Sequence, residues 1–124
     1  MILKVFLVGV FGGLGSVARY LSGAALSQAL SGTRLPWGTL FVNLTGCFAI
    51  GIAAGISQRM SGGNEQFRLA AIVGFLGGYT TFSAFGLDTL TLIRNGQTVT
   101  ALAYSLGTVV CGILLVQIGL RCSV

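Results

Sequence analysis

Four long apolar stretches dominate this chain and constrain its fold more than any other feature. They cover residues 3–26, 37–56, 69–93 and 99–120. A helix that crosses the hydrocarbon layer of a membrane needs about 20 mostly apolar residues, and each stretch is long enough. Because the polar connectors are short, consecutive helices should pack side by side in opposite directions. The sequence therefore predicts an all-α membrane protein in which residues 1–124 form one domain of four transmembrane helices.

The scarcity of charge supports this class. Only 7% of the residues are charged, whereas a soluble domain carries about 25%. The net charge of +5 does not indicate a nucleic-acid partner, because the basic residues are scattered singly. Lys4 and the apolar run after it have the outline of a signal peptide, but three further stretches and Arg19 within the first favour an uncleaved helix. We expect a multi-pass protein of the cell (inner) membrane that contacts lipid and not nucleic acid.

The reactive residues do not suggest an enzyme. The chain has no histidine, which excludes most zinc sites and His-dependent nucleophiles. Cys47 and Cys111 lie inside apolar stretches, Cys122 is at the tail, and there is no CxxC motif. The two acids are Asp88 and Glu65, and Glu65 sits in a polar connector, so a paired-carboxylate mechanism is disfavoured. We expect no enzymatic activity.

Lysine and arginine residues divide almost evenly between the two sides of the predicted bundle. One side holds Lys4, Arg59, Arg68 and Arg121, and the other holds Arg19, Arg34 and Arg94. Arg19 is assigned there because its helix carries it about 22 Å deeper than Lys4, near the far surface. Selecting one orientation needs a clear positive-inside bias, so this chain could insert both ways and pair with an oppositely inserted copy about a two-fold axis. A single, weakly determined orientation is the alternative.

Small residues spaced four apart recur within the stretches, at Gly51–Gly55, Gly74–Gly78 and Thr108–Gly112. This spacing puts them on one face of a helix, where a partner backbone can approach closely. The pattern predicts close helix contacts and leaves open whether these lie within one chain or between two.

The third stretch contains a segment that is poorly suited to a continuous helix. Gly77 and Gly78 are followed, after one residue, by Thr80 and Thr81, and both residue types have low helix propensity. We expect a break in the helix here. Unwound backbone at membrane depth is tolerated only where protein buries it or where it lines a wet cavity. Its free carbonyls can coordinate a cation and its N–H groups an anion; a glycine kink that serves only packing is the alternative.

Several polar and aromatic side chains lie inside the apolar stretches. Asn43 must be hydrogen-bonded in the membrane, either to another helix or, as a neutral donor, to an anion. Phe82 and Phe85 share a helix face, and their positive ring edges could replace part of an anion's water shell, although ordinary packing is commoner. Tyr104 and Thr108 also share a face and form a polar stripe, although hydroxyls in such helices often bond to their own backbone.

Three segments carry a resemblance to one family: GGLGSVARY at residues 12–20, GTLFVNLTG at 38–46 and GGYTTFSAF at 77–85. The chain resembles the Fluc (CrcB) family of fluoride channels in these segments, and the resemblance covers essentially its whole length. Its length, number of spans and balanced charge agree with that family. The third segment is the most specific. Compared with the family pattern, Tyr79 stands where leucine is common, Asp88 where glutamate is usual, and Ala84, Gly86 and Gly112 where hydroxyl residues occur.

The resemblance implies a fluoride-selective passive ion channel that exports fluoride and lowers its cytoplasmic concentration. It implies an antiparallel, dual-topology homodimer with two parallel pores. The fluoride path would be lined by Asn43, Phe82, Ser83, Phe85, Tyr104 and Thr108. Arg19 would face a vestibule, and main-chain carbonyls of Gly77 and Thr80 from both subunits would hold a central structural sodium ion.

Two other functions compete with this one. A small, proton-coupled multidrug exporter is also short, four-spanning and often dual in topology, but it needs a carboxylate inside the membrane. The first stretch contains no acid, and Asp88 lies near a predicted helix end. A non-conducting assembly subunit would use the glycine faces only for docking, and it would have no need of a broken third helix.

Overall fold

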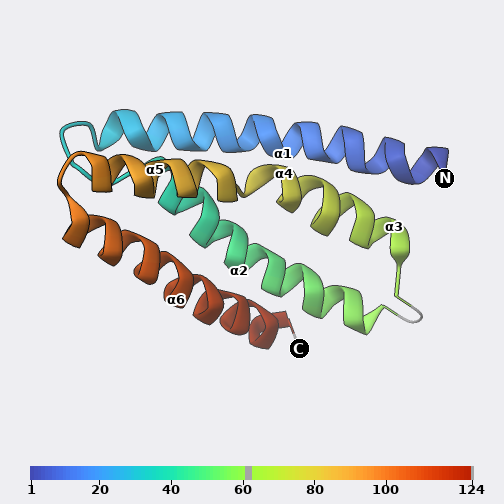
Figure 1. Cartoon of the computed structure of the whole chain (residues 1–124). Helices are drawn as coiled ribbons and strands as arrows, with labels where there is room; N and C mark the ends of the chain where they lie inside the picture. Colours follow the sequence, from blue (N-terminus) through green and yellow to red (C-terminus); the bar gives the residue numbers. More distant parts are fainter. Residues whose placement is uncertain (61–62, 124) are drawn as a thin grey trace.

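The computed structural model describes residues 1–60 and 63–123. In this part of the chain four helical spans are long and apolar enough to cross a membrane, and they form one bundle (Figure 1). The elements are α1 (Ile2–Ala29), α2 (Trp37–Arg59), α3 (Glu65–Phe67), η1 (Arg68–Leu76), α4 (Gly77–Tyr79), α5 (Phe82–Arg94) and α6 (Thr98–Ser123). Elements α3 to α5 together make the third span. The predicted all-α class and four spans are confirmed, and the helices extend a few residues beyond the apolar stretches.

The connectors alternate between the two ends of the bundle, as predicted. The N-terminus, α3 and the C-terminus lie toward one end in Figure 1, and the turns after α1 and α5 lie at the other. At the first end, Lys4 Nζ donates to Glu65 Oε1 at 2.8 Å. Both side chains of this ion pair are about half exposed, so it contributes little stability.

The contact between α2 and α6 depends on small residues. A Cβ atom on Gly51 would overlap the Val116 carbonyl oxygen and lie 3.0 Å from Gly119 Cα, and one on Gly55 would overlap the Ser123 hydroxyl. The backbones of the two helices therefore lie in direct contact, as this spacing allows. The predicted small-residue contact is present, and it lies within one chain.

A second small-residue contact joins α1 to the first half of the third span. A Cβ on Gly78 would overlap the Gly12 carbonyl oxygen, and one on Gly15 would overlap the Phe75 carbonyl oxygen. Gly74 belongs to the same row, since its Cβ would lie 2.9 Å from the Cβ of a neighbour on α1. The Gly74–Gly78 pair therefore also serves packing within the chain.

The third span is broken at Thr80 and Thr81, whose φ/ψ values of −83°/161° and −149°/120° are extended. The predicted break is present but shorter than expected, because Gly77 and Gly78 remain helical in α4. β-branched residues favour extended backbone, and the Thr81 hydroxyl begins the next helix by accepting from the Ala84 N–H at 3.3 Å. The glycines serve close packing and the threonines make the break.

The break lets the two halves of the third span pack on different partners. η1 and α4 pack against α1, whereas α5 packs mainly against α6. The first half also contains a feature that the sequence pattern did not predict, because η1 is a π-helix of 9 residues. Most π-helical segments are single turns, and they occur frequently at functional sites.

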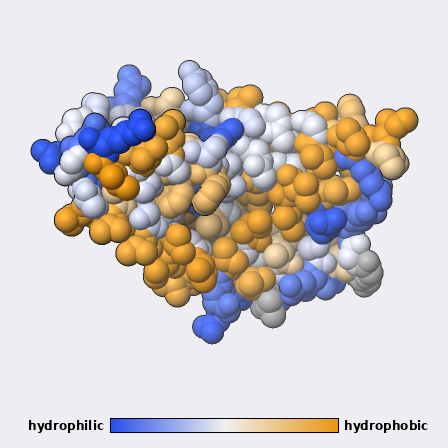
Figure 2. All heavy atoms as spheres, viewed as in Figure 1, coloured by the Kyte–Doolittle hydropathy of each residue, from blue (hydrophilic) through white to orange (hydrophobic). Residues whose placement is uncertain are grey.

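Few side chains are buried in the single chain, and most of the buried residues are glycines. Apolar side chains cover much of the face shown in Figure 2, and hydrophilic ones gather mainly toward its ends. Exposed large apolar residues occur on every span, among them Phe6, Phe41, Phe82 and Ile113. Such a surface indicates contact with lipid or with another protein.

Candidate functional site

Asn43 ties α2 to the break through two hydrogen bonds. Its Nδ2 donates to the Thr81 carbonyl at 2.9 Å, and its Oδ1 accepts from the Thr81 N–H at 2.8 Å. Only one orientation of the amide satisfies both partners. Asn43 thus forms the interhelical bond that the sequence left open as one alternative. Within the described residues its second amide N–H has no partner, so a donor remains for a ligand.

The carbonyl oxygens of Gly77 and Thr80 accept no hydrogen bond from any residue that the structure describes. In a continuous helix they would accept from the N–H groups of Thr81 and Ala84. The Thr81 N–H instead donates to Asn43, and the Ala84 N–H donates to the Thr81 hydroxyl. Two main-chain oxygens beside the break are therefore free to bind a ligand. They belong to Gly77 and Thr80, the residues for which the family resemblance implies a role as sodium ligands.

A cleft of about 280 Å³ opens beside the break. It brings together four of the predicted path residues: Asn43, Phe82, Phe85 and Thr108. The other lining residues are Gly46, Cys47, Ile50, Thr80, Thr81 and Val109. None of the residues that line the cleft carries a formal charge at neutral pH. The cleft can therefore offer an amide, hydroxyls and ring edges to a small solute, but no fixed ion.

The aromatic side chains form a chain of ring contacts along one side of this cleft. The ring centroids of Phe82 and Phe85 are 5.8 Å apart with the planes inclined by 38°, and those of Phe85 and Tyr104 are 5.4 Å apart at 42°. Phe82 and Phe85 therefore share a face, as predicted from their spacing. Phe82 is 84% exposed on the single chain, so the described residues leave most of its side chain uncovered.

The remaining predicted path residues lie at the margins of the cleft. Tyr104 is buried behind Phe85, and its hydroxyl has no hydrogen-bond partner in the described part of the chain. The Thr108 hydroxyl donates to the Tyr104 carbonyl at 2.6 Å, which is the bond to its own helix that the sequence left open. Ser83 is exposed and its Oγ lies 3.4 Å from the Thr81 hydroxyl. The structure therefore does not bring Ser83 and Tyr104 into the cleft lining.

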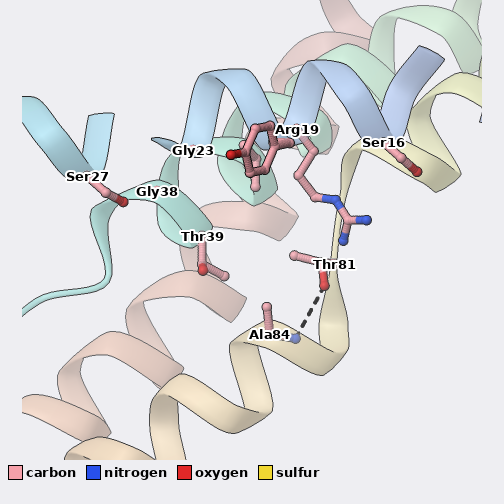
Figure 3. Close-up of a pocket in the computed structure, with 10 residues that line it drawn as sticks. Ser16, Arg19, Gly23, Ser27, Gly38, Thr39, Thr81 and Ala84 are labelled. Carbon is pink, nitrogen blue, oxygen red and sulfur yellow. Dashed lines mark hydrogen bonds between the residues drawn. The ribbon is translucent and has the colours of Figure 1, made fainter. Parts of the chain in front are cut away.

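Arg19 occupies a second pocket, of about 330 Å³, on the α1 side of the break. Its guanidinium extends from α1 toward Thr81 (Figure 3), and Ser16 and Thr39 are among the other polar residues of the lining. No ion pair involves Arg19 within residues 1–60 and 63–123. Arg19 and Thr81 line the same pocket, and α1 continues beyond Arg19 to Ala29.

Comparison with known proteins identifies the family. The model of the family described as "CrcB-like protein, Camphor Resistance (CrcB)" matches residues 6–120. A protein named "Fluoride-specific ion channel FluC" from Rhizobium meliloti (strain 1021) is 48% identical, over 94% of this chain and 92% of its own length. A protein of the same name from Solibacter usitatus (strain Ellin6076) is 44% identical, over 94% of this chain and 95% of its own length.

This chain belongs to the CrcB family. The resemblance noted in its three sequence segments is therefore confirmed. Membership in a family of ion channels also confirms the expectation that the protein is not an enzyme, and nothing supports the multidrug exporter. The four spans and the bacterial relatives fit a multi-pass protein of the inner membrane.

The structure places two residues at this CrcB site that the sequence-based list of site residues did not include. Gly46 packs directly against the break, because a Cβ there would overlap the methyl group of Thr80. Cys47 lines the cleft one residue further along α2. Both could have been found from Asn43, since residues three and four positions later lie on the same face of a helix.

Proposed function

We propose that this CrcB protein is a fluoride-selective, passive ion channel that exports fluoride and lowers its cytoplasmic concentration. The observation that supports this function best is the uncharged cleft beside the break, where Asn43, Phe82, Phe85 and Thr108 meet. Relatives at 44–48% identity over most of their length carry the name of a fluoride-specific ion channel.

The chemistry of the cleft suits a small, strongly hydrated anion. Removing water from such an ion is costly unless the protein replaces the lost hydrogen bonds. The free N–H of Asn43 and the positive edges of the two phenylalanine rings are neutral replacements, and the Thr108 hydroxyl would become a third if it turned away from the Tyr104 carbonyl. Because none of them is a fixed cation, the anion is bound weakly enough to leave again, as conduction requires.

The channel is proposed to work as a homodimer of two oppositely inserted copies. The near-even division of lysine and arginine between the two sides allows both orientations. Phe82 is almost fully exposed on the single chain although it lines the cleft. A second copy related by a two-fold axis in the membrane plane would cover this ring and close one pore on each side.

Arg19 and the remaining hydroxyls are proposed to extend the path away from the cleft. Arg19 lies in a pocket that shares Thr81 with the cleft, so it can attract anions into a vestibule on the other side of the break. Tyr104 and Ser83 are close to Phe85 and Thr81 respectively, where they can receive an ion that passes the rings.

A structural sodium ion is proposed to join the two copies at the break. The carbonyl oxygens of Gly77 and Thr80 lack hydrogen-bond partners in the described structure, and two chains together would supply four such oxygens. Neutral oxygen ligands suit a hard cation, so the residues present fit this ion. When bound, sodium would neutralise the carbonyl dipoles and keep both breaks extended.

Removing sodium is expected to stop most fluoride flux. Without the cation, unpaired carbonyls at membrane depth are costly, and the break should rearrange to pair them. The measurement is fluoride efflux after the purified protein has been exchanged into buffer with N-methylglucamine in place of sodium. Full flux after thorough exchange would contradict the sodium site and leave the fluoride path intact.

Ion flux from liposomes that contain only this purified protein tests the proposed function. Fluoride should leave rapidly under a membrane potential, and chloride should leave no faster than from liposomes without protein. Ion-selective electrodes measure both anions in matched samples. Equal release of the two anions would refute selectivity, and a lack of fluoride release would refute the channel function.

A further inference from the structure

Tyr79 is hydrogen-bonded to α2 immediately before the break. Its hydroxyl lies 2.9 Å from Thr45 Oγ1, and Thr45 Oγ1 lies 2.7 Å from the Phe41 carbonyl oxygen. A carbonyl can only accept, so the single hydroxyl proton of Thr45 goes to Phe41. The Tyr79 hydroxyl is therefore the donor to Thr45. This bond is independent of the two that Asn43 makes.

The ring of Tyr79 is also held in place by packing. It stacks on Phe75 with centroids 6.1 Å apart and planes inclined by only 9°. On the α2 side, the Cδ1 atom of the ring would lie 3.5 Å from a Cβ placed on Gly46. The side chain is therefore fixed by Phe75, by Gly46 and, at its tip, by the hydrogen bond to Thr45.

Three successive residues of the third span are thus attached to α2. Tyr79 donates to Thr45, the Thr80 methyl group lies against Gly46, and Thr81 pairs with the Asn43 amide. Tyr79 occupies the last position of α4, where the backbone changes from helical to extended. Its orientation therefore sets the direction in which the next peptide group points.

The Gly77 and Thr80 carbonyls, which lack hydrogen-bond partners in the described structure, lie on either side of Tyr79 in the sequence. The Gly77 carbonyl precedes it in α4, and the Thr80 carbonyl follows it in the break. Any rotation of Tyr79 about the helix end would move these two oxygens relative to each other. An aliphatic side chain could fill the same space, but it could not donate to Thr45.

We infer that Tyr79 is a positioning residue that holds the Gly77 and Thr80 carbonyls in the arrangement that binds sodium, through its hydroxyl bond to Thr45. The inference rests on the proposed function and deepens its sodium site. The Tyr79 hydroxyl is not a ligand in this proposal, because it is engaged with α2. Its contribution is the fixed geometry of the oxygens, which lowers the cost of ordering them when the ion binds.

Sodium binding by the purified full-length protein tests this role. Binding is measured with radioactive sodium at equilibrium, and independently as the rise in the unfolding temperature with sodium concentration. Tyr79→Phe removes only the hydroxyl and should raise the dissociation constant for sodium about threefold to tenfold, the loss expected for one neutral hydrogen bond. Thr45→Ala removes the acceptor and should give a similar change, and combining the two variants should add little.

Two further variants serve as controls. Thr45→Ser keeps the acceptor and should bind sodium like the unmodified protein. Thr91→Val removes a hydroxyl that donates to the Leu87 carbonyl of its own helix at 2.8 Å, away from the break, and should also leave sodium binding unchanged. If Tyr79→Phe misfolds, Thr45→Ala tests the same bond from the other side, with assembly checked by size-exclusion chromatography.

The possible results separate this inference from the proposed function. Sodium affinity that is unchanged in both Tyr79→Phe and Thr45→Ala would overturn the positioning role. A protein that conducts fluoride but binds no sodium would overturn it together with the sodium site, and the channel function would stand. If Tyr79→Phe and Thr45→Ala lower the unfolding temperature by the same amount at every sodium concentration, the bond contributes only to stability. That result would also overturn the positioning role.

Discussion

Replacing Phe85 with isoleucine is expected to reduce fluoride efflux from proteoliposomes at least about tenfold, since 1.4 kcal/mol of added barrier has that effect. Isoleucine is apolar and fills much of the space, but it has no ring edge with a positive electrostatic potential. Phe85 is at the centre of the aromatic row, between Phe82 at 5.8 Å and Tyr104 at 5.4 Å. Its loss should therefore remove a contact for the ion and leave the helices assembled. Phe82→Ile is expected to reduce efflux in the same way.

The matched control for these variants is Phe6→Ile. Phe6 is exposed on α1 and does not line the cleft, so the same chemical change there should leave efflux unaltered. Size-exclusion chromatography in detergent checks that all variants assemble alike. Efflux through Phe85→Ile and Phe82→Ile equal to that of the Phe6 control would rule out a role for ring edges in conduction.

Replacing Asn43 with alanine is expected to weaken fluoride binding and to reduce both flux and stability. The variant removes a cleft-lining amide that has a spare N–H donor, and it leaves the N–H and carbonyl of Thr81 without their partners. Each unpaired buried group costs about 1–3 kcal/mol, so a lower unfolding temperature should accompany the loss of flux. Fluoride affinity is measured by isothermal titration, and flux in liposomes.

Asn43→Asp separates the two roles of this side chain. The carboxyl group can still accept from the Thr81 N–H, but an ionised carboxylate has no donor for the Thr81 carbonyl or for an anion. We expect stability between that of Asn43→Ala and the unmodified protein, and no fluoride binding. Gln117→Ala, which removes an exposed amide on α6, is the control. Unchanged fluoride affinity in Asn43→Ala would assign this residue to structure alone.

Much of the fold could be predicted because it depends on properties of single segments. The number of spans follows from the length and composition of each apolar stretch, and the alternation of connectors follows from their shortness. The glycine pairs indicated close helix contacts because spacing by four places residues on one face. The pair at Gly51 and Gly55 and the pair at Gly74 and Gly78 do make such contacts. Their partners, which are α6 and α1 respectively, could not be read from the spacing.

The sequence predicted which residues belong to the candidate site better than it predicted how those residues are arranged. Asn43, Phe82, Phe85 and Thr108 do meet in one cleft. Arg19 lies in a separate pocket on the α1 side of the break, which shares only Thr81 with the cleft. Gly77 was expected in the unwound segment but is helical, and only its carbonyl is affected by the break. These differences depend on how neighbouring helices share hydrogen bonds.

The sequence by itself determined that the chain spans a membrane, that its third helix is weak at the Gly-Gly and Thr-Thr pairs, and that uncharged groups stand at this weak point. These properties follow from hydrophobic length and local backbone preference, which each segment carries alone. Only the tertiary structure decided that the break falls at Thr80 and Thr81, that Asn43 and Tyr79 anchor it to α2, and that the carbonyls of Gly77 and Thr80 are left over. The physical reason is that the Thr81 N–H leaves the helical pattern because the Asn43 side chain accepts it, and the packing of α2 against the third span brings that side chain near.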